Sequence, residues 1–102
     1  MQCDILSELI NYGMSLRVTA DYWDKDLFQQ QVYSIWAVDE LYLELTKHPE
    51  RNQEEILEDF VKRMDQYALI NSKKSRMFSI AKDTALDIID QIITRRIINE
   101  SK

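Results

Sequence analysis

The chain has 102 residues with a formal net charge of −5, and it contains one Gly, one Pro, one Cys and one His. So few turn-forming residues exclude an all-β fold and a glycine-rich phosphate loop, and a lone His with a lone Cys excludes the usual Cys/His zinc site. The length fits a single domain over residues 1–102, and the acidic balance disfavours direct binding to nucleic acid.

The N-terminal residues lack a basic stretch followed by an apolar run. The chain also lacks an apolar stretch of about 18 residues, the length that marks a membrane span. The sequence therefore predicts neither a signal peptide nor a transmembrane helix, and we expect a cytoplasmic protein without a membrane partner. Cys3 has no partner for an internal disulfide, and no cationic neighbour in the sequence would activate its thiol.

The first segment with helical periodicity covers residues 5–16, and Asp4 is its expected N-cap. Gly13 lies on the apolar face of this helix, and two interpretations stay open. It ends the helix, or it lets another helix approach closely. The same face carries the apolar residues Ile5, Leu6, Leu9, Ile10, Tyr12 and Leu16.

The second helix is predicted over residues 21–47, with Thr19 or Asp21 as its cap. It ends before Pro49, because the residue that precedes a proline avoids helical angles. His48 is interpreted as its C-cap, and a metal site shared with Glu44 is the alternative.

Apolar side chains cover about 220° of the second helix, whereas a surface helix usually carries a stripe little wider than 100°. The surplus has to be covered by the rest of the chain or by another molecule, and we predict an interface. The residues assigned to this interface are Trp23, Phe28, Val32, Ile35, Trp36, Asp39, Tyr42 and Leu43.

Asp39 is a carboxylate within this apolar arc, where a charge is costly unless it is paired or hydrogen-bonded. We predict a pairing with Lys or Arg across a bundle or dimer seam, and a functional acid is the alternative. Gln31 lies on the same side and is a candidate for the same polar network.

The third helix is predicted over residues 53–70, because Asn52 and Glu55 have the spacing of a capping box. Two favourable i,i+4 ion pairs are expected on its polar side, Glu58–Lys62 and Asp59–Arg63. Its apolar stripe consists of Ile56, Leu57, Phe60, Val61, Met64, Tyr67 and Ala68.

A polar loop over 71–76 precedes the fourth helix, predicted over 75–99. Lys73, Lys74 and Arg76 form a basic turn, either a solvated loop or a site for a phosphate or an acidic partner. The outer acids of the helix, Asp83, Asp87 and Asp90, are interpreted as a solvated face. Because short connections join long helices, the expected fold is an all-α, up-and-down bundle of about four helices.

Acidic residues recur on the second and third predicted helices, and segments 39–44 and 54–59 resemble the MazG-like nucleotide pyrophosphohydrolases. In that all-α family, acidic pairs spaced three apart on two successive helices hold Mg²⁺ against a nucleoside triphosphate. Glu55 and Glu58 have this spacing but lie outside the apolar stripe of their helix, and Glu40 and Glu44 lie four apart. The resemblance implies a metal-dependent hydrolase built on Asp39, Glu40, Glu44, Glu55 and Glu58.

The sequence favours a small acidic interaction or regulatory module that self-associates through the second helix and catalyses no reaction. Its expected partner is a second copy of the chain, forming a homodimer, or a basic protein. No residue is assigned to catalysis or to a metal, and no cofactor is expected. Two alternatives stay open: the MazG-like hydrolase, and a bundle that binds a small hydrophobic ligand in a pocket lined by Trp23, Phe28 and Trp36.

Overall fold

The computed structural model describes residues 5–19 and 23–100, apart from the side chain of residue 99. These residues form four helices and no strand. The helices are α1 (Ile5–Val18), α2 (Lys25–Lys47), α3 (Gln53–Ile70) and α4 (Ser75–Glu100). The predicted all-α class and the number of helices are therefore confirmed.

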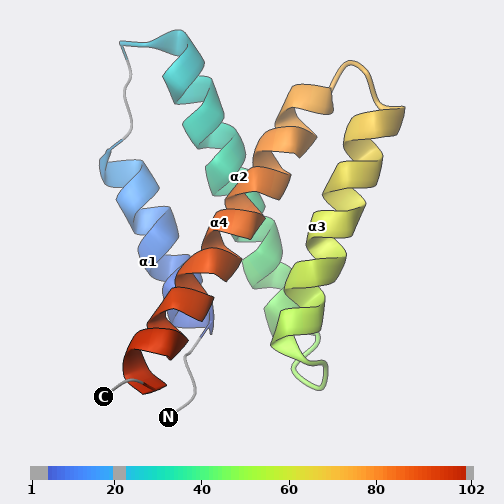
Figure 1. Ribbon diagram of the computed structural model, residues 1–102. Helices are drawn as coiled ribbons and strands as arrows, with labels where there is room; N and C mark the ends of the chain where they lie inside the picture. Colours follow the sequence, from blue (N-terminus) through green and yellow to red (C-terminus); the bar gives the residue numbers. More distant parts are fainter. Residues whose placement is uncertain (1–4, 20–22, 101–102) are drawn as a thin grey trace.

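Successive helices run in opposite directions, so the bundle has the predicted up-and-down course (Figure 1). The central helices are α2 and α4, which cross each other, and they are flanked by α1 and α3. The start of α1, the end of α4 and the α2–α3 connection lie at one end of the molecule. The α3–α4 connection and the start of α2 lie at the other end.

The core is built from all four helices, and small side chains occupy the middle of it. Ala37 of α2 and Ala81 and Ala85 of α4 are completely buried, which lets helix backbones approach closely. Nearby, the hydroxyl of Thr84 lies 2.9 Å from the hydroxyl of Ser34 and links α4 to α2. The larger core side chains are Ile5, Leu9, Val38, Leu41, Leu45, Ile56, Leu57, Phe60, Met64, Ile88 and Ile92.

Gly13 decides how closely α1 packs on α2. The helix continues past it to Val18, so the interpretation of Gly13 as a helix end is wrong. A Cβ atom at this position would lie 3.3 Å from Cγ1 of Val38, which is tighter than an ordinary contact. The alternative interpretation, that Gly13 permits a close approach of another helix, is confirmed.

The start of α2 differs from the prediction by four residues. Its N-cap is Asp24, whose Oδ1 accepts hydrogen bonds from the backbone N–H groups of Asp26 (3.0 Å) and Leu27 (3.2 Å). Thr19 does not cap α2, because its hydroxyl bonds back to the carbonyl of Ser15 at 2.8 Å. Trp23 consequently precedes the helix. The other predicted caps, Asp4 and Asp21, lie outside the described residues, as does Cys3.

The caps at the α2–α3 connection match the prediction. Asn52 caps α3 by accepting from the backbone N–H of Glu54 at 2.8 Å, and His48 is the C-cap of α2. The predicted Asp59–Arg63 pair is replaced. Asp59 instead pairs with Arg51 of the preceding turn at 2.6 Å, and the Arg63 guanidinium lies over the ring of Phe60.

Candidate functional site

The outward side of α2 carries apolar side chains that the chain itself leaves uncovered. Phe28, Val32, Tyr42 and Leu43 are 37%, 43%, 38% and 47% exposed, and Ile35 between them is half-buried. The opposite side of the helix supplies the buried residues Ala37, Val38, Leu41 and Leu45. The wide apolar arc of this helix is thus only partly used by its own core.

Two residues of α1 extend this surface. Ile10 and Met14, one turn apart, are 47% and 59% exposed, and they line a shallow groove with Tyr42 of α2. The buried side chains of Leu9 and Val38 form part of the groove wall. We call the combined surface the α1–α2 face, and it consists of Ile10, Met14, Phe28, Val32, Ile35, Tyr42 and Leu43.

Asp39 and Arg17 form an ion pair at the edge of the same groove. Arg17 Nη2 lies 3.4 Å from Asp39 Oδ1, and the two side chains are 51% and 59% exposed. The predicted pairing of Asp39 is therefore present, between α1 and α2 of one chain, and in water rather than in the core. The side-chain amide of Gln31, the other candidate for this network, donates to the carbonyl of Thr19 at 3.0 Å.

The two tryptophans differ in their surroundings. Trp36 is half-buried and packs edge-on against Phe78 of α4, with 6.3 Å between the ring centroids. Trp23 is 98% exposed, which is incompatible with the wall of an enclosed pocket. The structure therefore does not gather Trp23, Phe28 and Trp36 around one cavity. The wheel of α2 did not reveal this division, because it does not show which flank α4 covers.

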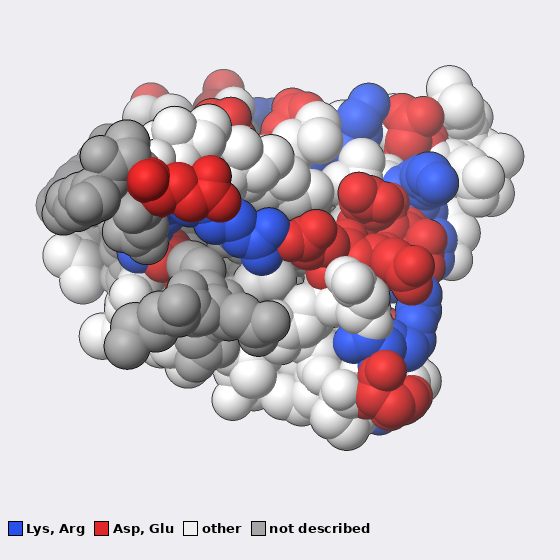
Figure 2. Space-filling view, turned by 60° about the horizontal axis from the view of Figure 1, so that its bottom comes forward, with Lys and Arg blue, Asp and Glu red and all other residues white. Residues whose placement is uncertain are grey.

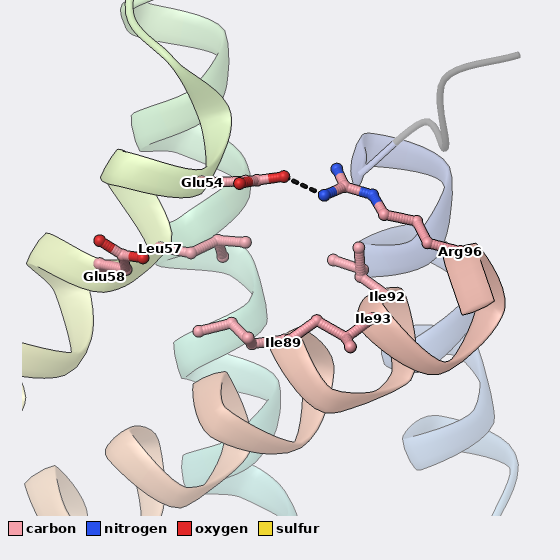
Figure 3. Close-up of a pocket in the computed structure, with 7 residues that line it drawn as sticks. All are labelled: Glu54, Leu57, Glu58, Ile89, Ile92, Ile93 and Arg96. Atoms are coloured by element: carbon pink, nitrogen blue, oxygen red, sulfur yellow. Dashed lines mark hydrogen bonds and ion pairs between the residues drawn. The ribbon is translucent and has the colours of Figure 1, made fainter.

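A groove between α3 and α4 is lined by aliphatic residues, and Figure 3 shows how they lie. Leu57, Ile89, Ile92 and Ile93 form its apolar lining, and Arg96 reaches across to pair with Glu54. Its volume is about 90 Å³. Pockets for drug-sized ligands usually exceed about 300 Å³, so this groove holds a few heavy atoms at most.

Two polar contacts join α1 to the middle and the last turns of α4. The carboxylate of the buried Glu8 pairs with Arg95, and the hydroxyl of Tyr12 donates to Asp87 at 2.7 Å. Burial, helped by this hydrogen bond, raises the pKa of Tyr12 above its usual range. Sequence periodicity did not indicate these contacts, since Glu8 interrupts the apolar run and its partner lies on a distant helix.

The acids of the MazG-like resemblance are not assembled into a metal site. Glu55 and Glu58 are exposed on α3, and Glu44 lies near His48, with 4.0 Å between Oε2 and Nε2. In the described part of the chain, no three His, Cys, Asp or Glu side chains converge in a way that would hold a metal ion. The outer acids of α4, Asp83, Asp87 and Asp90, are also exposed.

Charge differs between the two connections that flank α3. Residues 44–59, around the α2–α3 connection, hold six acids and two bases. Figure 2 looks toward that end and shows Asp and Glu side chains gathered there, with Lys and Arg between them. Residues 66–82, around the α3–α4 connection, hold four bases and no acid.

Comparisons of the chain with protein-family models, with curated proteins and with solved structures find no match. Over the residues that the structure describes, no helix has the length and apolar character needed to cross a membrane. The geometry of the α1–α2 face and the charges of the two connections that flank α3 are therefore the basis for a functional proposal.

Proposed function

We propose that the protein is a protein–protein interaction module that forms a homodimer through the α1–α2 face. The observation that carries this proposal is the row of exposed apolar side chains along α2, at Phe28, Val32, Tyr42 and Leu43. From residue 28 to residue 43 the row extends about 22 Å along the helix, at 1.5 Å per residue. Contiguous apolar surface of this kind on a small protein is typical of an interaction site.

The chemistry of the α1–α2 face suits pairing with a second copy. Arg17 and Asp39, which are opposite charges on one surface, border its groove. In a two-fold dimer the same patch meets itself, so each protomer presents an acid and a base to its partner. Aromatic and aliphatic anchors around such a pair are what interface cores contain.

The test is the molar mass by light scattering after size exclusion, over a hundredfold range of concentration. We expect about 24 kDa, twice the chain mass of 12.2 kDa. Val32→Glu combined with Leu43→Glu should give a 12 kDa species, because it buries two unpaired carboxylates in the interface.

Leu86→Glu is the matched control, because Leu86 is 44% exposed on α4, outside the α1–α2 face. This variant should keep the mass of the dimer. A wild-type protein that stays monomeric at every concentration, or a dimer that Val32→Glu and Leu43→Glu leave intact, would refute the proposal.

A further inference from the structure

The end of α3 exposes two adjacent aliphatic side chains. Leu69 and Ile70 are 80% and 79% exposed, far more than any residue of the α1–α2 face. They are the last two helical residues before the α3–α4 connection, which projects from the bundle in Figure 1. Large apolar side chains at a projecting turn contribute nothing to the core of the chain.

Basic side chains follow directly. Lys73 and Lys74 are exposed, and neither pairs with an acid among the described residues. Arg76 lies one turn further, where it bonds to Gln29 at 2.9 Å. We call Leu69, Ile70, Lys73 and Lys74 the α3–α4 tip. It combines apolar and positive character in a chain whose net charge is −5.

The position of Lys74 is unfavourable for the helix that it begins. Its carbonyl accepts the first helical hydrogen bond of α4, from the N–H of Phe78 at 3.1 Å, so Lys74 is the N-cap. A lysine side chain cannot accept a bond from the free N–H groups there, and its charge opposes the helix dipole. The first turn of α4 holds no acid to compensate. The caps of α2 and α3, Asp24 and Asn52, have the favoured chemistry.

We propose that the α3–α4 tip docks on the surface of an anionic lipid bilayer. Leu69 and Ile70 would enter the boundary between headgroups and acyl chains, while Lys73 and Lys74 would lie against the anionic headgroups. Trp23, which is 98% exposed, precedes α2 at the same end of the bundle and is of the residue type enriched at such boundaries.

A bilayer fits these features better than a protein partner does. Protein interfaces place their apolar anchors near the centre of a well-packed patch, whereas here they project beside unpaired lysines. The six acids around the α2–α3 connection lie at the opposite end, and Asp26, at the start of α2 near the tip, lies 3.9 Å from the Arg76 guanidinium. The expectation of no membrane partner was derived from the lack of a spanning segment, which surface docking does not require.

The experiment is sedimentation of the full chain with vesicles of phosphatidylcholine, with or without about one third phosphatidylserine. Binding is expected only with the anionic vesicles, and it should weaken as salt is raised. Lys73→Gln with Lys74→Gln should lower partitioning about thirtyfold, since each lysine near an anionic surface contributes about fivefold. Leu69→Gln with Ile70→Gln should lower it by a similar or larger factor.

Lys47→Gln with Lys62→Gln is the matched control, because it removes the same charge from exposed sites outside the tip. This variant should bind as the wild type does.

A second measurement uses the Trp36→Phe variant, in which Trp23 is the one remaining tryptophan. The maximum of its fluorescence emission should shift to shorter wavelength when anionic vesicles are added. Absence of sedimentation with anionic vesicles would overturn the proposal, as would equal binding by the wild type and the tip variants.

Discussion

The two connections that flank α3 differ in charge and in how they begin the next helix. The α2–α3 connection is acidic, with six acids and two bases over 44–59, and it supplies Asn52 as the cap of α3. The α3–α4 connection is basic, with four bases and no acid over 66–82, and it places Lys74 at the start of α4. Acids near a helix N-terminus are stabilising and bases there are not.

This difference separates a structural end from a candidate functional end. Two of the six acids around the α2–α3 connection, Glu54 and Glu55, are explained by the folding of α3, because they lie in its first turn. The lysines of the α3–α4 tip have no such explanation, because a base at the start of α4 does not stabilise that helix. Positions that break a local rule are where functional sites are expected, which is why the proposal of membrane docking concerns the basic end.

The prediction with the largest expected effect on stability tests whether the two connections that flank α3 belong to one folding unit. Phe60 is buried in α3 between them. We expect Phe60→Ala to lower the free energy of unfolding by about 3–5 kcal/mol, through lost burial and the cavity left behind. Urea denaturation followed by circular dichroism measures this loss. Two separate transitions in the variant would show that the ends unfold independently.

The second test compares the asparagines at the two connections. Asn52→Ala should lower stability by about 1 kcal/mol, because it leaves two N–H groups at the start of α3 without an acceptor. Asn71→Ala should lower the free energy of unfolding by less, because the Asn71 side chain accepts only one such hydrogen bond, from the backbone N–H of Lys74 at 3.2 Å. Both values come from chemical denaturation. An equal loss would contradict the assignment of Asn52 as the stronger cap.

The third test converts the basic end into an ordinary helix start. Lys74→Asp should raise stability by about 0.5–1 kcal/mol, since it supplies a cap acceptor and a favourable charge. The same variant should bind anionic vesicles more weakly than the wild type. Lys73→Asp makes the same charge change outside the cap position, so it should weaken vesicle binding with a smaller gain in stability. If neither variant becomes more stable, Lys74 is not a compromised cap.

The smallest test concerns pH at the acidic end. A hydrogen bond from its own backbone lowers the pKa of Glu50 from 4.5, and His48 adds to the effect. Because the folded-state pKa is depressed, this contribution to stability is present above pH 4.5 and is lost as the pH falls through the lower value. NMR titration of native and urea-unfolded protein measures the difference. His48→Ala should move the native value part of the way back, and identical native and unfolded values would contradict the assignment.

Most of the helix boundaries could be predicted from sequence because strong local signals mark them. The bounds of α3 follow from Asn52 and from the polar residues after Ile70, and the end of α2 follows from Pro49. The start of α2 was missed because several acids and a threonine precede it. Which of them caps the helix depends on backbone angles that a sequence pattern does not reveal.

A sequence pattern could not predict which apolar side chains of α2 are buried in the core and which face the solvent. A helical wheel shows that the apolar arc is too wide, but not which flank each neighbouring helix covers. The structure places Trp36 against Phe78, and it adds Ile10 and Met14 of α1 to the exposed surface. The helical spacing of Ile10, Met14 and Arg17 places them on one side of α1. This spacing indicates a shared surface with α2 only once Asp39 is known to lie opposite Arg17.

The even number of helices determines at which end of the bundle a label or handle is attached. After four antiparallel passes, the start of α1 and the end of α4 lie at the same end of the bundle, opposite to the α3–α4 tip (Figure 1). A fluorescent label or an affinity handle attached beyond the start of α1 or the end of α4 therefore joins the bundle at the end opposite to the α3–α4 tip. The molecule can be tethered to a sensor chip or imaged in a cell with the α3–α4 tip left accessible.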